Sequence, residues 1–205
     1  IMWSGAAGKQ IQGLFYAAPV YDIPAIAAFL SILITTINFV TSVEVNFYPK
    51  YRAFFDELNN GGILKDIRRA GDEMKSVLFR ELTYTFMKQL FTTLIFIIGG
   101  SILLPKLPLG FDDDMLGIYR VLCMGYAFYA VGNCIMLIEL YFADNTGALI
   151  SGTVFMSVSC AGTFFFRNMD IKYYGIGFWA GSVLFSLTAF IILRKKKKKL
   201  MYNVL

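Results

Sequence analysis

The 205-residue sequence contains no histidine and few charged residues. Histidine is the most frequent general acid or base near neutral pH and the commonest side-chain metal ligand. Its absence excludes histidine-based catalysis, histidine metal sites and the commonest pH switch. Charged residues make up 16% of the chain, whereas a soluble domain carries about a quarter. The chain therefore has too few water-facing side chains for an ordinary soluble protein.

Cysteine is also sparse, and the sequence shows no motif typical of a catalytic site. Cys123, Cys134 and Cys160 fall in apolar stretches without CxxC spacing, so we expect small buried residues rather than a disulfide framework or a metal site. There is no Walker loop, no glycine-rich dinucleotide turn and no cluster of metal ligands. We expect no catalytic, cofactor or metal site.

Long apolar stretches are what the sequence has in abundance. Hydrophobic residues make up 57% of the chain, and the mean hydropathy is +0.60. A helix needs about 20 apolar residues to cross a bilayer, and five stretches satisfy this requirement. They are residues 24–47, 83–104, 115–141, 146–166 and 173–193. The sequence predicts an all-α, polytopic membrane helical bundle with about five transmembrane helices.

The distribution of basic residues predicts the orientation of this bundle. Lysine and arginine concentrate in loop 48–82 and in the tail 194–205, which opens with the run RKKKKK. Cytoplasmic loops of membrane proteins are enriched in these residues. We therefore expect segment 1–23 outside the cytoplasm and the C-terminus inside it. The net charge of +5 is explained by these blocks, so no nucleic-acid partner is indicated.

The start of the chain lacks an initiator methionine, a basic region before an apolar core, and a complete membrane span. These features argue against a signal peptide at this position. We expect the sequence to be the C-terminal part of a longer protein.

Loop 48–82 is expected to contain its own helix. Residues 59–62, Asn-Asn-Gly-Gly, form a turn signal. Apolar residues then recur at helical spacing through residue 78, which predicts a basic amphipathic helix along the membrane interface. Its simpler role is to lead the chain into the next span, and we favour this role over partner docking. The candidate docking or membrane-surface residues are Lys50, Arg52, Arg68, Arg69 and Lys75.

Several polar residues interrupt the spans. An ionisable group inside the bilayer costs about 2.5–3.5 kcal/mol on insertion scales, so each one invites a functional interpretation. Taken singly, each is more simply a structural charge that reaches the interface. Taken together they are consistent with a hydrophilic cavity open to the cytoplasm, or with an internal Glu44–Lys88 pair. The candidate transport-path residues are Glu44, Lys88, Glu139, Asn38, Asn133 and Arg120.

Glycines are frequent in the third and fourth spans. Small residues let membrane helices approach closely, so some of these glycines are expected at helix–helix contacts. They are Gly125, Gly132, Gly147, Gly152 and Gly162.

One part of the chain, residues 13–67, resembles the PelG family of exopolysaccharide export proteins. The resemblance rests on an AP-x-YDIP motif at residues 18–24, an E-x-N-FY-x-x-YR-x-FF motif at residues 44–55, and the Gly-Gly pair followed by a helix. It continues to the basic tail and so covers most of the chain.

The resemblance implies a location and a substrate. PelG-like proteins are similar to the MOP flippase superfamily, whose members have twelve or more helices in two bundles around a central cavity. By this resemblance the chain is the C-terminal half of such a fold, in the bacterial inner membrane, exporting an amino-sugar-rich polysaccharide. Glu44 would then lie at the cytoplasmic mouth of the cavity, where it could meet a cationic polymer.

These features lead to three alternative functions. The first is a transporter part that moves a polysaccharide across the membrane. The second is a scaffold that recruits a cytosolic glycosyltransferase to other membrane subunits of a secretion complex. The third, a membrane enzyme, is disfavoured because the sequence shows no nucleophile–base pair and no metal-ligand set. A transporter requires polar groups that face a shared lumen, whereas a scaffold requires a prominent loop surface.

Overall fold

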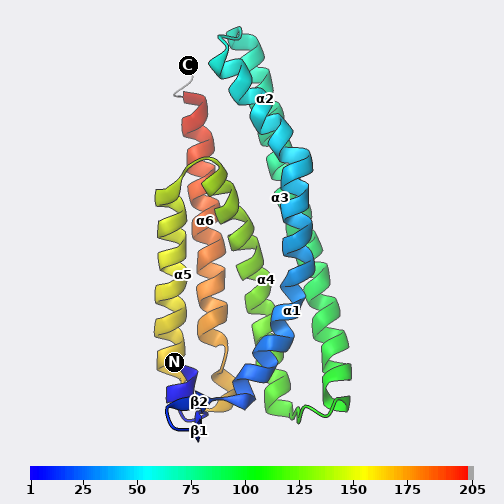
Figure 1. Ribbon diagram of the computed structural model, residues 1–205, viewed down its shortest axis with the longest axis vertical. Coiled ribbons are helices and arrows are strands. Elements are labelled where there is room, and N and C mark those ends of the chain that lie inside the picture. Colours follow the sequence, from blue (N-terminus) through cyan, green and yellow to red (C-terminus); the bar gives the residue numbers. More distant parts are fainter. Residues whose placement is uncertain (203–205) are drawn as a thin grey trace.

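The structure is a computed structural model that describes the backbone of residues 1–202 and the side chains of residues 1–196 (Figure 1). The end of the predicted basic tail, residues 203–205, lies outside the described residues. Five helical segments are long and apolar enough to cross a membrane. This confirms the predicted all-α class and the number of spans. The five segments are Pro19–Asn59, Leu64–Lys106, Asp113–Tyr141, Asn145–Phe166 and Ile171–Lys196.

Six α-helices build the bundle. In chain order they are α1 (Pro19–Ser42), α2 (Tyr48–Asn59), α3 (Leu64–Leu103), α4 (Asp113–Tyr141), α5 (Asn145–Phe166) and α6 (Ile176–Tyr202). A π-helical segment, Val43–Phe47, joins α1 to α2 without a break. Short 3₁₀ turns precede α4 and α6, at Leu104–Lys106 and Ile171–Tyr173.

The N-terminal segment is a 3₁₀ turn, Met2–Ser4, followed by a β-hairpin. Its strands β1 (Lys9–Gln12) and β2 (Phe15–Ala17) are antiparallel. Helix α1 then starts at Pro19, five residues before the predicted start at residue 24. Proline suits the first helical position because its missing N–H has no partner there. The Asp22 carboxylate also accepts the Ala18 N–H at 2.9 Å, which fixes this helix end.

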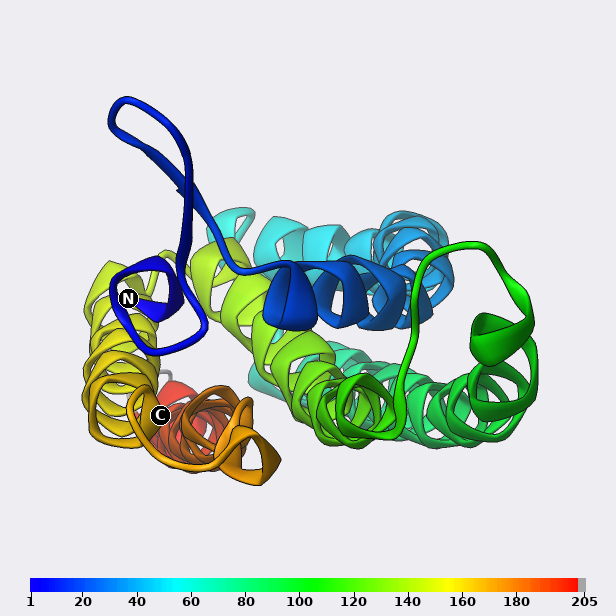
Figure 2. The same cartoon turned by 90° about the horizontal axis from the view of Figure 1, so that it is seen from below.

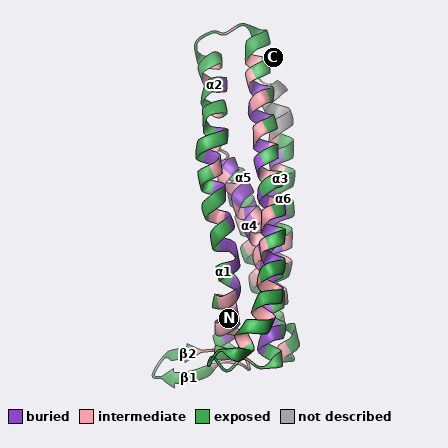
Figure 3. Ribbon diagram, turned by 90° about the vertical axis from the view of Figure 1, so that its right-hand side faces the viewer, coloured by how far each residue is buried: buried purple, intermediate pink, exposed green. Residues whose placement is uncertain are grey.

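Helix α3 differs from the sequence prediction. We expected an amphipathic helix lying along the interface and a separate span, but one helix of 40 residues contains both. Its length of about 60 Å is twice the ~30 Å of the bilayer core. The start of α3 extends beyond α4 and α5 and pairs with α2 as an α2–α3 hairpin (Figures 1 and 3).

The apolar stripe of the amphipathic segment explains this difference. Met74 and Leu78 are buried in one cluster with Phe54 of α2, so the stripe faces protein and not lipid headgroups. Gly71 lies under the Phe54 ring, where an added Cβ would come within 3.1 Å of it. The predicted turn at residues 59–62 is confirmed, since α2 ends at Asn59 and Gly61 has a positive φ of 70°. At the other end of α3, Gly100 does not end the helix, which continues to Leu103.

Helix α4 occupies the centre of the bundle. It packs against α1 and α3 on one side and against α5 and α6 on the other (Figure 2). The α2–α3 hairpin and the basic C-terminal part of α6 lie at the same end of the molecule, called the basic end below. The β-hairpin lies at the opposite end, called the hairpin end.

Helices α5 and α6 approach each other through small residues. A Cβ added to Gly162 would lie 2.7 Å from the Cα of Gly177, closer than two carbon atoms pack. Gly125 and Gly132 of α4 lie against the rings of Phe178 and Phe185. The sequence-based expectation of close packing at some glycines is thus confirmed for these positions.

Candidate functional site

Helix α3 carries a buried polar stripe. Glu81, Thr85, Gln89 and Thr93 follow one another at intervals of four residues, and all four are buried. With 3.6 residues per turn, this spacing keeps the four side chains close to one face of the helix. Such a stripe is unusual on a membrane helix, where lipid-facing side chains are apolar.

Between α1 and α3 lies a polar groove, the candidate site. It has a volume of about 230 Å³, and most of the side chains around it carry hydroxyl, amide or ammonium groups. The lining residues are Thr35, Asn38, Phe39, Thr41, Ser42, Val45, Asn46, Tyr84, Thr85 and Lys88. The groove lies in the half of the spans nearer the basic end.

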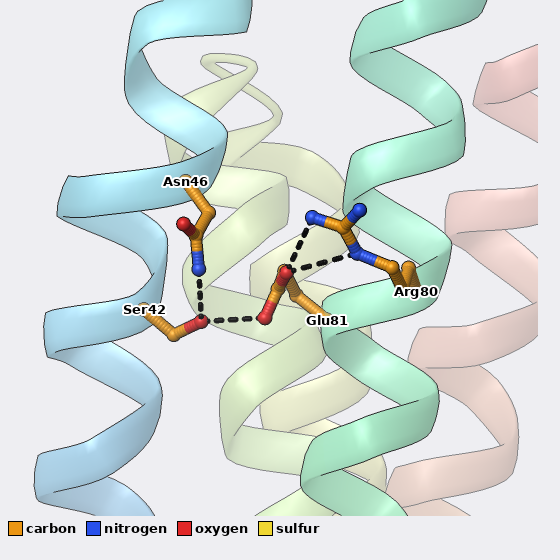
Figure 4. A network of polar contacts seen from close by, with 4 residues as sticks. All are labelled: Ser42, Asn46, Arg80 and Glu81. Carbon is orange, nitrogen blue, oxygen red and sulfur yellow. Dashed lines mark hydrogen bonds and ion pairs between the residues drawn. The ribbon is translucent and has the colours of Figure 1, made fainter.

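A hydrogen-bond network links α1 to α3 on the side of the groove nearer the basic end (Figure 4). The Ser42 hydroxyl donates to one Glu81 carboxylate oxygen at 2.6 Å and accepts from the Asn46 amide at 3.2 Å. Arg80 donates to the other Glu81 oxygen from Nε and Nη2, at 3.2 and 3.0 Å. A buried carboxylate is stable only with such partners. The network therefore ties the end of α1 to α3.

One groove residue has a hydrogen-bonding atom without a partner. The Thr35 hydroxyl oxygen is buried and has no hydrogen bond to any described residue. The side-chain oxygen of Gln89, which belongs to the polar stripe and directly follows Lys88 in the sequence, is in the same situation. Leaving a buried polar atom unpaired costs about 1–3 kcal/mol, and natural proteins keep few such atoms. Thr35 thus gives the groove a hydrogen-bonding atom that no described residue pairs.

Glu44 lies in the π-helical segment and is exposed. Its carboxylate accepts a hydrogen bond from the Tyr141 hydroxyl at the end of α4. π-Helical turns are rare and often occur at functional sites. Here the turn and the hydrogen bond connect α1 to α4 at the basic end.

The predicted Glu44–Lys88 pair is wrong. Lys88 lines the groove with its ammonium 4.5 Å from the centre of the Tyr84 ring, a cation–π contact. Glu44 points toward α4, because residue 44 is about half a turn from Ser42 and Asn46, which point toward α3. The two charges therefore lie on different faces of the bundle.

The remaining predicted path residues lie elsewhere. Glu139 is fully buried in α4, and neither carboxylate oxygen has a hydrogen bond to a described residue. Asn133 is half-buried on α4. Arg120 donates to the Ser101 hydroxyl at 3.0 Å near the hairpin end. Of the six predicted residues, the groove brings together Asn38 and Lys88.

Comparison of the sequence with known families gives a match over the whole chain. The family model PelG, described as "Putative exopolysaccharide Exporter (EPS-E)", matches residues 1–205. The chain belongs to this family. Comparisons with curated proteins and with solved structures gave no match. The protein is thus a membrane protein of an exopolysaccharide exporter family, which is a transporter family and not an enzyme family.

In this exporter family member, most of the predicted docking residues are paired within the α2–α3 hairpin. Lys50 and Arg69 both contact Glu73, at 2.9 and 3.3 Å. Arg52 lies 3.7 Å from Asp56, and Lys75 lies 3.6 Å from Asp72. Arg68 is exposed. The surface of the hairpin therefore carries both acidic and basic side chains, most of them in ion pairs, along with its exposed arginines.

Sequence reasoning missed Glu81 and its hydrogen-bond partners. It assigned residue 81 to a cytoplasmic loop, because the apolar stretch begins at residue 83. The four-residue spacing from Glu81 through Thr93 was the available signal. It predicts a polar helix face only once α3 is known to continue through residue 81.

Proposed function

We propose that this chain forms part of the path by which an exopolysaccharide crosses the bacterial cytoplasmic membrane. The polar groove between α1 and α3 carries the proposal, because it places hydroxyl, amide and ammonium groups together at the depth of the spans. Moving a sugar hydroxyl out of water without new hydrogen bonds costs about 2–7 kcal/mol of free energy. Groups such as those of Asn38, Thr41 and Lys88 offset that loss.

In this proposal the basic end faces the cytoplasm. Loops rich in lysine and arginine remain on that side, and the basic end holds the α2–α3 hairpin and the lysine run. The network around Glu81 then closes the groove on its cytoplasmic side. Polymer made in the cytoplasm would meet this end first.

We further propose an amino-sugar-rich substrate. The buried Glu81 carboxylate at the end of the groove and the exposed Glu44 carboxylate, which faces α4, both lie toward the basic end and suit a polymer that carries ammonium groups. The Tyr141 hydroxyl holds Glu44 in place. A cationic polymer would compete for both carboxylates as it entered.

Secretion by the full-length exporter in cells tests the groove. We expect Asn38→Leu and Lys88→Met each to reduce secreted polymer at least tenfold, because each replaces a polar groove group by an apolar one. Asn168→Leu and Lys106→Met make the same replacements at exposed sites near the hairpin end. Membrane levels are checked by blotting. Secretion by the groove variants equal to that of the controls would refute the proposal.

The substrate proposal needs a separate test. We expect Glu44→Gln to reduce secretion of a deacetylated polymer more than secretion of a fully acetylated one. Tyr141→Phe removes the hydrogen bond but keeps the carboxylate, so it serves as the matched control. Equal effects of Glu44→Gln on both polymers would remove Glu44 from substrate recognition and leave the groove proposal intact.

A second candidate function is favoured by the α2–α3 hairpin. It extends beyond the bundle, and exposed residues predominate on α2 (Figure 3). Such a projection suits docking of a cytosolic glycosyltransferase, with Arg52 and Arg68 as exposed contacts. The double variant Arg52→Glu and Arg68→Glu should lose co-purification of the synthase. Undiminished co-purification would exclude these arginines as contacts.

A further inference from the structure

A second hollow lies between α3, α4 and α6, apart from the polar groove. Its volume is about 350 Å³, and nearly all of its wall is apolar. The residues lining this apolar crevice are Phe79, Leu82, Thr83, Phe86, Phe128, Val131, Ile135, Ser186, Leu187 and Phe190. Helices α3 and α6 both pack against α4, and the crevice lies in the space between them.

Basic side chains surround the end of the crevice nearer the basic end. A small adjoining hollow shares Phe79 with the crevice and includes Lys75 of α3 and Lys196 of α6 in its lining. The guanidinium of Arg194 lies 5.5 Å from the centre of the Phe190 ring, which lines the crevice itself. The mouth of the crevice therefore receives cations from two helices.

Acidic groups only partly balance these cations. Lys75 lies 3.6 Å from the largely exposed Asp72, and Lys196 lies 3.1 Å from Asp144. Arg194 forms no ion pair with a described residue and is exposed. Lys75 itself is nearly buried, with 11% of its side chain exposed. Arg194 thus supplies a positive charge next to the apolar crevice that no carboxylate of the described residues pairs.

The length of the site matches one leaflet of a bilayer. Lys75 and Phe86 are eleven residues apart on α3, about 17 Å along the helix axis. The hydrocarbon layer of one leaflet is about 15 Å thick, half of the ~30 Å core. A lipid whose phosphate lies at Lys75 would therefore have its acyl chain alongside the crevice.

We propose that the apolar crevice is a binding site for an anionic phospholipid. One acyl chain lies in the crevice, and the phosphate contacts Lys75, Arg194 and Lys196. Within a bilayer the acyl chain gains little free energy by moving from other lipids into the crevice, because both surroundings are apolar. Packing in the crevice and attraction to the headgroup therefore decide which lipid is selected. The lipid fills the space between α3 and α6 and links the α2–α3 hairpin to the tail.

Lipid binding to the purified exporter in detergent tests the proposed contacts between the basic side chains and the lipid headgroup. The probes are phosphatidylglycerol and phosphatidylcholine with identical acyl chains, and bound lipid is counted by native mass spectrometry. We expect preferential retention of phosphatidylglycerol. A basic group near a membrane surface contributes about 1 kcal/mol, so Arg194→Gln should weaken phosphatidylglycerol binding about fivefold. Arg52→Gln, on the exposed face of α2, should leave it unchanged.

A second pair of variants tests the crevice. Leu187 lines it and is half exposed, so Leu187→Trp should fill the crevice and abolish retention of the lipid. Leu149→Trp makes the same change on exposed α5, away from the crevice, and should retain the lipid. Equal binding of the two lipids, or binding unaffected by Arg194→Gln, would overturn the headgroup assignment. Retention of lipid by Leu187→Trp would overturn the crevice as its site.

Discussion

The contact between α5 and α6 allows a quantitative prediction. Gly162 lies where α5 meets the backbone of α6, and an added Cβ would come 2.7 Å from the Cα of Gly177. Gly152 lies on the same helix, with no atom of the described residues within 4 Å of its added Cβ. The substitutions Gly162→Ala and Gly152→Ala therefore change the same helix by the same methyl group, one into a contact and one into open space.

The expected difference in stability between the two variants follows from three contributions. Carbon atoms pack at about 3.5–4.0 Å, so the Gly162→Ala methyl must push the helices about 1 Å apart. Overpacking of this kind costs about 1–3 kcal/mol. Replacing glycine by alanine inside a helix gains up to about 1 kcal/mol at either position. The helix gain cancels in the comparison, so Gly162→Ala should be about 2 kcal/mol less stable than Gly152→Ala.

Thermal unfolding of the detergent-purified protein measures this difference. For a chain of this length, 1 kcal/mol shifts Tm by about 2–4 °C. We expect Gly162→Ala to unfold about 6 °C below Gly152→Ala. Equal Tm values would show that α5 and α6 are not in close backbone contact at residue 162.

Three further predictions concern the network and the helix ends. Glu81→Ala should lower the free energy of unfolding by about 1–2 kcal/mol more than Glu81→Gln, and Tm accordingly, since glutamine keeps an acceptor for the Ser42 hydroxyl; equal losses would argue against the network. At Asp144, burial raises the pKa, but the Gly147 N–H and the Lys196 ammonium outweigh burial and lower it. Its contribution to stability is thus present above the unfolded pKa of about 3.9 and lost as pH falls through the folded value; Asp144→Asn should flatten the drop in Tm below about pH 4. Asp112→Ala removes the side-chain acceptor for the Met115 N–H (2.8 Å) and should cost about 1 kcal/mol in thermal unfolding, with an unchanged Tm contradicting the cap.

The spans and the family were accessible from the sequence. The number of spans depends on apolar length alone, and the turn at residues 59–62 depends on glycine, which accepts a positive φ. The PelG resemblance rested on local motifs, and the family match over residues 1–205 confirms it. The orientation that follows from the basic residues stays a prediction.

Tertiary packing decided where those elements end. The apolar stripe with Met74 and Leu78 suits either a membrane interface or a neighbouring helix, because both offer an apolar surface. The position of α2 settled this choice and made α3 one long helix. The glycines show the same limit: a Cβ added to Gly162 would meet α6, whereas a Cβ added to Gly152 would meet open space, although both lie in one apolar helix.

The candidate site shows most clearly what the sequence determined and what it did not. The sequence identified Asn38 and Lys88 as polar residues, since each is an exception in an apolar stretch, but it did not identify Glu81. Which of them meet depends on helix rotation, and that is set by contacts between residues far apart in the chain. The rotation of α1 directs Ser42 to Glu81 and Glu44 to Tyr141. The same rotation places Asn38 in one groove with Lys88. Glu139 lies outside this groove, buried in α4.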